Sequence, residues 1–301
     1  AQGLMDRRRF LRTAAGALAL CGSSPARGIN LGFSLYGMKP LPLDDALKAC
    51  ADAGYGHVEL ALLPGFPTDP AAFTAEARAA TAARLKAQGL GLPCLMENLS
   101  LTASDAAPAL RRIADAARLA RDLVPERPPI LETVLGGRPD EWEIRKDAMA
   151  GRLRDWAAAA EREKTVIAVK AHVMSAVNSP GRLLWLLEQA PSPAIQAAYD
   201  YSHFELQGLG LEETLGKLLP RTRFIHVKDS AGDAAKVRFL LPGEGRTDYV
   251  KYFSLLKRHR YEGPVCVEVS GQVFNQPGYD PVAAARRCFA TLSAALAKAG
   301  N

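Results

Sequence analysis

The stretch Tyr199–Phe204, which reads YDYSHF, ends a short apolar run with a carboxylate and an imidazole. The segments 224–229 (FIHVKD) and 265–270 (VCVEVS) have the same form. A strand that is buried on both faces gives such an apolar run, and an α/β barrel presents its chemistry at the carboxyl ends of its strands. We therefore expect Asp200, His226 and Glu268 to meet at one rim, where their oxygen and nitrogen atoms would suit a divalent metal.

The rest of the sequence alternates between strand and helix patterns from Ile29 onward. We predict strands at 29–35, 57–60, 90–96, 129–134, 165–171, 194–199, 222–227 and 264–269. We predict helices at 43–53, 70–88, 104–123, 140–162, from 179, and at 211–219, 249–258 and 281–298. Eight strand–helix pairs without a break in composition predict one closed (β/α)8 TIM barrel over residues 27–301. An open doubly wound sheet would need a Gly-rich turn after the first strand, and the segment 34–38 (SLYGM) is not such a turn.

The N-terminal end has the pattern of an export signal. Residues 7–12 (RRRFLR) precede the apolar run 14–20, as in a twin-arginine signal peptide. Small residues favour cleavage after Ala26, so we predict a signal peptide over 1–26, with residues 1–4 as an upstream remnant or start. The apolar run is too short for a stable membrane span. The expected location is the periplasm.

The charge distribution and the cysteines exclude some functions. Half of the net charge of +6 comes from residues 1–26, and the remaining charges are interspersed, so the sequence does not indicate nucleic-acid binding. Cys50, Cys94, Cys266 and Cys288 form no close pair and lie in apolar contexts, which favours buried free thiols.

Polar residues gather at the predicted carboxyl ends of the strands. They are Glu59, Glu97, Glu132, Lys170, His172, Asp200, His203, His226 and Glu268. The motifs that carry them occur in the order 56–60 (GHVEL), Asp200-x-x-His203, 225–229 (IHVKD), 241–245 (LPGEG) and 263–268 (GPVCVE). In this order and spacing the chain resembles the sugar phosphate isomerase/epimerase superfamily, which has xylose-isomerase-like barrels.

The resemblance implies a divalent metal held by a Glu on the fifth strand, an Asp on the sixth, a His on the seventh and a Glu on the eighth. Asp200, His226 and Glu268 match three of these ligands, and His203 matches a nearby histidine that contacts the substrate. Mn²⁺, Mg²⁺ or Zn²⁺ in such a site polarises a sugar carbonyl and hydroxyl, while adjacent carboxylates move the proton.

Lys170 departs from this pattern, because it stands where the family has its fourth metal ligand, and a protonated lysine cannot bind a metal. Four interpretations remain open. Three ligands, with His172 or Glu132 completing the set, hold a metal while Lys170 acts as an acid, base or substrate anchor. Alternatively, Lys170 is carbamylated, its ammonium replaces the metal, or the barrel has lost catalysis and only binds sugars.

The main hypothesis is an exported isomerase or epimerase, or a related lyase or hydratase, acting on a small sugar or keto-sugar next to its carbonyl. Proton transfer is assigned to Glu268, Lys170 and His203. The expected substrate-binding residues are Glu59, His172, Arg238 and Glu132, with a wall of rim aromatics formed by Tyr36, Phe66, Phe274 and Tyr279. His57, near the start of its strand, is expected to be structural, and Lys228 and Asp229 are expected to pair with each other. The sequence leaves the oligomeric state open and is compatible with a homo-oligomer.

Two alternatives belong to other classes. One is a periplasmic sugar-binding barrel that is non-catalytic or metal-free, which Lys170 suggests. The other is DNA repair of the endonuclease IV type, which shares the barrel but normally needs more histidine ligands than this chain offers.

Overall fold

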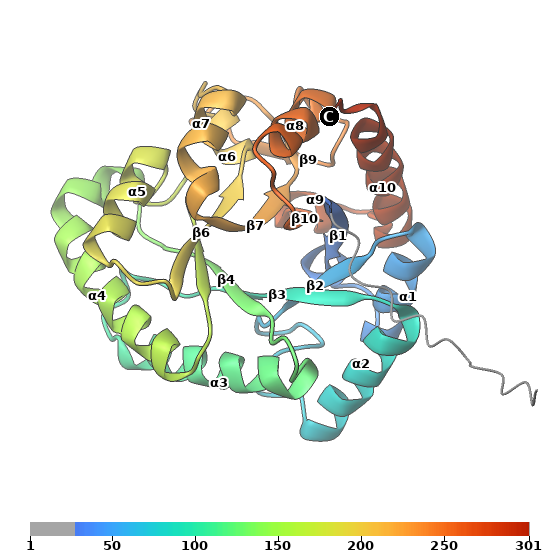
Figure 1. The fold of residues 1–301 in the computed structure, drawn as a ribbon, viewed down its shortest axis with the longest axis horizontal. Helices are drawn as coiled ribbons and strands as arrows, with labels where there is room; N and C mark the ends of the chain where they lie inside the picture. Colours follow the sequence, from blue (N-terminus) through green and yellow to red (C-terminus); the bar gives the residue numbers. More distant parts are fainter. Residues whose placement is uncertain (1–27, 301) are drawn as a thin grey trace, which may run out of the picture.

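The computed structural model describes residues 28–300, so the signal peptide predicted for residues 1–26 lies outside the described part of the chain. Eight parallel strands close into a barrel in the order β1-β10-β7-β6-β5-β4-β3-β2. Helices surround the strands as an outer ring (Figure 1). This confirms the predicted (β/α)8 TIM barrel.

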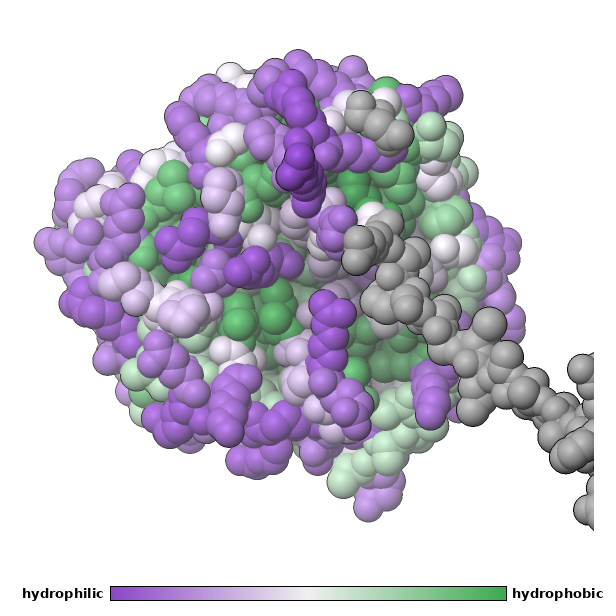
Figure 2. Space-filling model, in the orientation of Figure 1, coloured by the Kyte–Doolittle hydropathy of each residue, from purple (hydrophilic) through white to green (hydrophobic). Residues whose placement is uncertain are grey.

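The barrel strands are short and almost wholly buried. They are β1 Asn30–Ser34, β2 His57–Ala61, β3 Gly91–Glu97, β4 Ile130–Val134, β5 Ile167–Lys170, β6 Ile195–Asp200, β7 Thr222–Val227 and β10 Pro264–Val267. The main helices are α1 Leu43–Ala53, α2 Ala75–Gln88, α3 Ala107–Leu123, α4 Trp142–Arg162, α5 Pro180–Gln189, α7 Leu211–Leu218, α8 Tyr249–Arg258 and α10 Pro281–Lys298. Their outer faces are mainly hydrophilic at the periphery of the view in Figure 2.

Local signals explain the helix boundaries. Helix α1 ends at Gly54, whose φ of 101° is in the left-handed region that favours glycine. Helix α8 begins after Asp248, whose side chain accepts a hydrogen bond from the backbone N–H of Lys251. Helix α2 begins at Ala75 rather than at residue 70, because Thr74 caps it through the N–H of Ala77.

Several short elements follow the strands at the rim. They are the helices α6 Ser202–Glu205 and α9 Gly271–Phe274, the antiparallel pair β8 Asp229–Ala231 and β9 Arg238–Leu240, and the 3-10 turns η1 Leu35–Met38, η2 Pro139–Glu141 and η3 Leu219–Arg221. The sequence patterns did not predict any of them. All of the short helices and strands that follow β6, β7 and β10 lie next to predicted site residues.

The lower part of the barrel interior is closely packed and largely apolar. Cys94, Phe224 and Cys266 form a buried cluster there, which we call the barrel floor. The His57 ring lies against Gly32, where a Cβ atom would come within 2.1 Å of the imidazole. His57 is therefore a packing residue, as predicted. Burial lowers its pKa to about 3, so the ring is neutral.

The four cysteines within the described residues, Cys50, Cys94, Cys266 and Cys288, are buried and free, as predicted. Within residues 28–300 no helix has the length and apolar character needed to cross a bilayer.

Candidate active site

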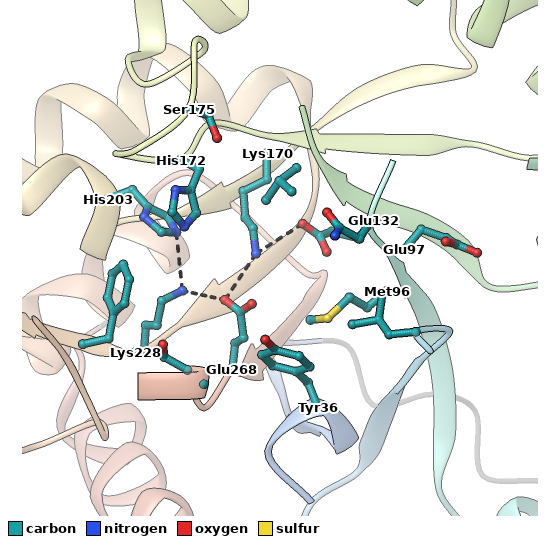
Figure 3. Close-up of a pocket in the computed structure, with 16 residues that line it drawn as sticks. Tyr36, Met96, Glu97, Glu132, Lys170, His172, Ser175, His203, Lys228 and Glu268 are labelled. Atoms are coloured by element: carbon teal, nitrogen blue, oxygen red, sulfur yellow. Dashed lines mark hydrogen bonds and ion pairs between the residues drawn. The ribbon is translucent and has the colours of Figure 1, made fainter. Parts of the chain in front are cut away.

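A cavity of about 260 Å³ opens at the carboxyl ends of the strands. Among the residues that line it are Glu132, Lys170, His172, His203, Lys228 and Glu268. We call this end of the barrel the mouth. Figure 3 shows Glu268 between the ends of Lys170 and Lys228.

The alternation of strand side chains explains how charged groups reach the mouth from apolar strands. Residues two apart on a strand face the same side, so the inward position Phe224 on the floor is followed by His226 and then Lys228. In the same way Cys266 is followed by Glu268. On β7 and β10 the inward-facing side chains therefore change from apolar to ionisable within one or two positions.

Lys170, at the end of β5, is 2% exposed and joins three side chains from other strands. Its Nζ lies 3.2 Å from Glu132 Oε1 and 3.2 Å from Glu268 Oε2. It also lies 2.8 Å from Nδ1 of His226. Burial alone would lower the pKa of Lys170, but Glu132 and Glu268 outweigh it and raise this pKa, so the side chain is an ammonium ion.

His226 connects Lys170 to a deeper carboxylate. Its Nε2 lies 2.9 Å from Oε2 of Glu59, and both side chains are fully buried. Because the Lys170 ammonium donates to Nδ1, that atom must be an acceptor, and Nε2–H donates to Glu59. Burial would lower the pKa of His226, but Glu59 outweighs burial and raises this pKa. The ring is thus fixed at both nitrogens.

Lys228, just past the end of β7, forms the second cationic centre. Its Nζ donates to Asp200 Oδ2, and it lies 2.5 Å from Glu268 Oε2 and 3.5 Å from His203 Nε2. The same ammonium lies 5.0 Å from the centre of the Phe239 ring. Glu268 Oε2 therefore accepts hydrogen bonds from both lysines.

The two lysines control the charge of the carboxylates. Burial would raise the pKa of Glu268, but Lys170 and Lys228 outweigh burial and hold this pKa well below its usual range. Lys228 and His203 outweigh burial in the same way for the pKa of Asp200. Glu132 differs, because burial dominates over Lys170 and raises its pKa.

One wall of the cavity consists of stacked rings. The His172 and His203 rings lie 4.1 Å apart, and the Phe239 ring packs edge-on against His203 at 5.2 Å. Burial lowers the pKa of His203 to about 4 and that of His172 to about 2, so both rings are neutral. Among the described residues, Nδ1 of His203 has no hydrogen-bond partner.

On the opposite side Tyr36 lines the cavity and lies within a group of rim aromatics. Its ring stacks on Phe66 at 5.4 Å and meets the edge of Phe274 at 4.9 Å. Tyr279, which was also expected in this wall, donates its hydroxyl to the carbonyl of Gly37 and lines a neighbouring groove. Glu97 lines the cavity but is paired with Arg112 at 2.7 Å.

Five of the predicted site residues line the cavity, whereas Glu59, Asp200, His226 and Arg238 do not. Asp200 and His226 are buried next to the residues that line it. Glu59 does not line the cavity, because it lies below His226, so its contact is with the imidazole rather than with a substrate. Arg238 is exposed on β9 and lines the neighbouring groove, while the next residue, Phe239, reaches the cavity.

Lys228 was missed as a site residue, and its predicted pairing with Asp229 is wrong. Lys228 turns inward to Asp200 and Glu268, whereas Asp229 accepts the backbone N–H groups of Gly243 and Gly245. Consecutive residues of an extended chain face opposite sides, so the side chains of Lys228 and Asp229 point away from each other. The spacing of Lys228 two residues after His226 was the available signal.

The residues present can be tested against the divalent metal that the resemblance implies. Within the part of the chain that the structure describes, two groups of side chains offer ligand atoms within 4.8 Å of one another: Glu59, His226 and Cys266 form one, and Asp200, His226 and Glu268 form the other, which is the set that the resemblance implies. However, an ammonium nitrogen already contacts each side chain of this second set. As the side chains lie, this set does not fit a divalent ion, and binding of a metal stays a prediction.

The closed barrel and the charged cavity at its mouth define the class of (β/α)8 proteins that carry their site at the carboxyl ends of the strands. Residues 47–292 match the family described as xylose isomerase-like TIM barrel, and the chain belongs to this family.

Individual relatives are more distant. An inosose dehydratase of Clostridium tetani (strain Massachusetts / E88) is 25% identical over 155 residues, which cover 46% of this chain and 51% of the relative. The chain thus spans about half the length of the curated relatives it matches.

Solved structures match over almost the whole chain. A xylose isomerase domain protein from Alicyclobacillus acidocaldarius has a TM-score of 0.75 at 22% identity, with 90% of this chain and 99% of that chain covered. The IolI protein with a bound zinc atom has a TM-score of 0.73 at 16% identity, covering 90% and 99%. The 3-keto-D-glucoside 4-epimerase YcjR from E. coli has a TM-score of 0.67 at 16% identity, covering 88% and 99%. At these identities the structures establish the shared fold.

Proposed function

We propose that this chain is a carbohydrate-acting enzyme that moves a proton next to the carbonyl of a sugar or keto-sugar. The observation that carries the proposal is Glu268, a partly exposed carboxylate that two buried ammonium groups flank in a polar cavity. The family and the similarity to inosose dehydratase support a sugar as the substrate class.

Glu268 is the proposed proton acceptor. Its side chain is 13% exposed, compared with 2% for Glu132, so it is the carboxylate that a bound sugar reaches more easily. When a carbonyl oxygen of the substrate accepts the hydrogen bonds of Lys170 and Lys228, Glu268 loses those two donors. Its pKa then rises, and the carboxylate becomes a stronger base at the moment it is needed.

In the proposed step a proton moves from the substrate to Glu268, and the negative charge left behind moves to the carbonyl oxygen. Glu268 takes the proton from the carbon beside the carbonyl, and the C–H electron pair moves to give an enediolate. The ammonium groups of Lys170 and Lys228 stabilise the new oxyanion. Return of the proton to the other carbon, with the hydroxyl proton moving to the former carbonyl oxygen, gives isomerisation. Delivery of a proton to the opposite face of the original carbon gives epimerisation, and loss of a β-hydroxyl that takes the proton from Glu268 and leaves as water gives dehydration.

Substrate hydroxyls can use polar atoms that have no hydrogen-bond partner within residues 28–300. In this part of the chain His203 Nδ1 is buried and has no partner, and Glu132 Oε1 has only its ion pair with Lys170 at 3.2 Å; both residues line the cavity. Buried polar atoms are normally satisfied, so donors and acceptors on a polyol suit them. If the export signal predicted over residues 1–26 operates, the substrate is a free or oxidised sugar of the periplasm rather than a phosphorylated metabolite.

Exchange in deuterated water tests this proposal. The protein is incubated with a panel of ketoses, cyclic keto-polyols and oxidised sugars, and proton NMR follows the loss of the C–H signal next to the carbonyl. We expect exchange with at least one sugar, and none with Glu268→Gln. If no sugar on the panel exchanges or changes, the enzyme assignment fails.

A second function, a non-catalytic sugar-binding barrel, is favoured by Lys170 at the position where the resemblance expects a metal-binding Glu. Sugar binding measured by calorimetry, without exchange or product, would support this second function.

A further inference from the structure

We propose that the ammonium of Lys170 takes the place of a divalent ion, so that this member of the family carries its cation within its own chain. The inference deepens the proposed function, because a sugar oxyanion would then be stabilised by lysine rather than by metal. Only the catalytic role of Lys170 rests on the proposed function. The absence of room for a metal is inferred from the contacts of the lysines alone.

The first argument is that lysine nitrogens contact each of the three ligands that the resemblance implies, Asp200, His226 and Glu268. Lys170 Nζ is 2.8 Å from His226 Nδ1 and 3.2 Å from Glu268 Oε2. Lys228 contacts Asp200 and the same oxygen of Glu268. For a metal to bind, at least Lys170 would have to leave two of the three ligand groups.

The second argument is the charge of the buried cluster. Four buried or nearly buried carboxylates, Glu59, Glu132, Asp200 and Glu268, surround two ammonium groups. His226 lies between the Lys170 ammonium and the Glu59 carboxylate. A divalent ion in the position of Lys170 would lie beside the Lys228 ammonium, which contacts Asp200 and Glu268, and the two like charges would repel each other in a region of low dielectric constant.

The third argument concerns carbamylation, which would turn Lys170 into a carboxylate. Lys170 Nζ lies between the carboxylates of Glu132 and Glu268, each 3.2 Å away. A carbamate would replace the attractive cation with an anion next to both acids, and it would remove the donor to His226. The surroundings of Lys170 therefore suit the unmodified ammonium.

Lys170 is also held too firmly to act as a surface lysine. It is 2% exposed, and its three contacts come from β4, β7 and the residue following β10. The Lys170 ammonium is therefore a charge held in a fixed position, as a bound metal ion would be. Unlike a metal ion, it cannot be removed by chelators.

The test compares metal binding in the full protein and in variants at this position. Wild-type protein, purified without chelators, is titrated with Co²⁺ and Zn²⁺, dialysed and assayed for metal by plasma mass spectrometry. We expect no bound metal. Lys170→Glu supplies the fourth ligand, and we expect it to retain about one equivalent and to show the visible absorption of tetrahedrally coordinated Co²⁺.

Two matched variants separate charge from ligation. Lys170→Met removes the ammonium without adding a ligand, and we expect it to retain less metal than Lys170→Glu. His226→Ala in the Lys170→Glu background removes one ligand and should abolish the retained metal. If Lys170→Glu does not fold, by circular dichroism, the wild-type titration decides the question by itself.

One equivalent of metal in the wild type, lost in His226→Ala, would overturn the inference. A carbamate signal in ¹³C NMR after addition of labelled bicarbonate would overturn it too. Metal content is measured without any sugar. A chain that binds no metal and turns over no sugar would therefore end the proposed function but leave this inference in place.

Discussion

The floor and the mouth of the barrel are built from the same strands, yet they are stabilised in opposite ways. On the floor the side chains of Cys94, Phe224 and Cys266, none of which is charged, pack together. At the mouth, one or two inward positions further along the strands, Lys170, Lys228 and Glu268 are nearly as buried. Their burial is tolerated because the two lysines neutralise the charge of Glu268. The floor loses only contact area when a residue changes, whereas the mouth loses the partner of a buried charge.

The difference teaches that burial alone says little about what a residue does. His57 in the lower part of the barrel and His226 near the mouth are both buried. Nε2 of His57 has no partner within residues 28–300, and the ring is a neutral packing group. His226 is fixed between Lys170 and Glu59. The partners, rather than the depth, distinguish the structural histidine from the site histidine.

The largest expected effect is on turnover, after Glu268→Gln at the mouth. Loss of the proposed base should lower kcat/KM by about 10²- to 10⁴-fold. Deuterium exchange into the sugar measures the rate, and calorimetry checks that the sugar still binds. Full exchange in this variant would show that the mouth carboxylate is not the base.

The next effect is on stability, after Lys170→Met. It leaves Glu132 and Glu268 with one ammonium fewer, which should lower the free energy of unfolding by about 3–5 kcal/mol, as for other broken buried pairs. Urea denaturation measures the change. Adding Glu132→Gln to the same chain should recover part of the loss, and no recovery would contradict a charge-based cause.

The dependence of stability on pH should distinguish His57 from surface histidines. Its pKa of about 3 in the fold lies below the value of about 6.5 in the unfolded chain. Between these pH values the unfolded chain binds a proton that the native protein excludes, so stability falls as pH decreases from about 6.5 toward 3.

His57→Gln should therefore reduce this slope by up to about 1.4 kcal/mol per pH unit. Urea denaturation at several pH values gives the slope. His172 and His203, whose pKa values burial also lowers, keep their own contribution in both proteins. The exposed His259→Gln serves as a control and should leave the slope unchanged. An equal slope in wild type and His57→Gln would count against a neutral His57.

A smaller effect is expected on the floor. Cys266→Ala removes one buried sulfur atom from an apolar cluster, and the free energy of unfolding should fall by about 1 kcal/mol. Sugar turnover should not change. A loss as large as that of Lys170→Met would mean that floor and mouth do not differ in the way described.

The smallest effect is expected for Arg238→Ala. Arg238 is exposed and lies outside the cavity, so stability should change by less than about 0.5 kcal/mol and turnover should stay at the wild-type rate. A clear rise in KM for the sugar would extend the site into the neighbouring groove.

Much of the fold could be predicted from the sequence because its signals are local. The bounds of α1, α8 and α10 agree with the predicted 43–53, 249–258 and 281–298, since glycine or aspartate marks one end of each. The pair β8 and β9 has three residues in each strand and depends on tertiary contacts, which no local pattern records.

The candidate site was predictable as a set of positions but not as a set of contacts. The strand ends placed Asp200, His226 and Glu268 together, which the structure confirms. The contact between Lys170 on β5 and His226 on β7 crosses the barrel past β6, and it depends on the length and direction of one long side chain. The sequence pattern carries no such information.

The position of Lys170 has a consequence for how such a site evolves. Glutamate and lysine codons differ by one base, so a single point mutation exchanges the ligand that the resemblance expects on the fifth strand for the ammonium found here. Asp200, His226 and Glu268 need not change, because Lys170 contacts His226 and Glu268 while Lys228 contacts Asp200. With Lys170 in the proposed role, a metal-dependent and a metal-independent form of this barrel would be one mutational step apart, and the pocket would not have to be rebuilt.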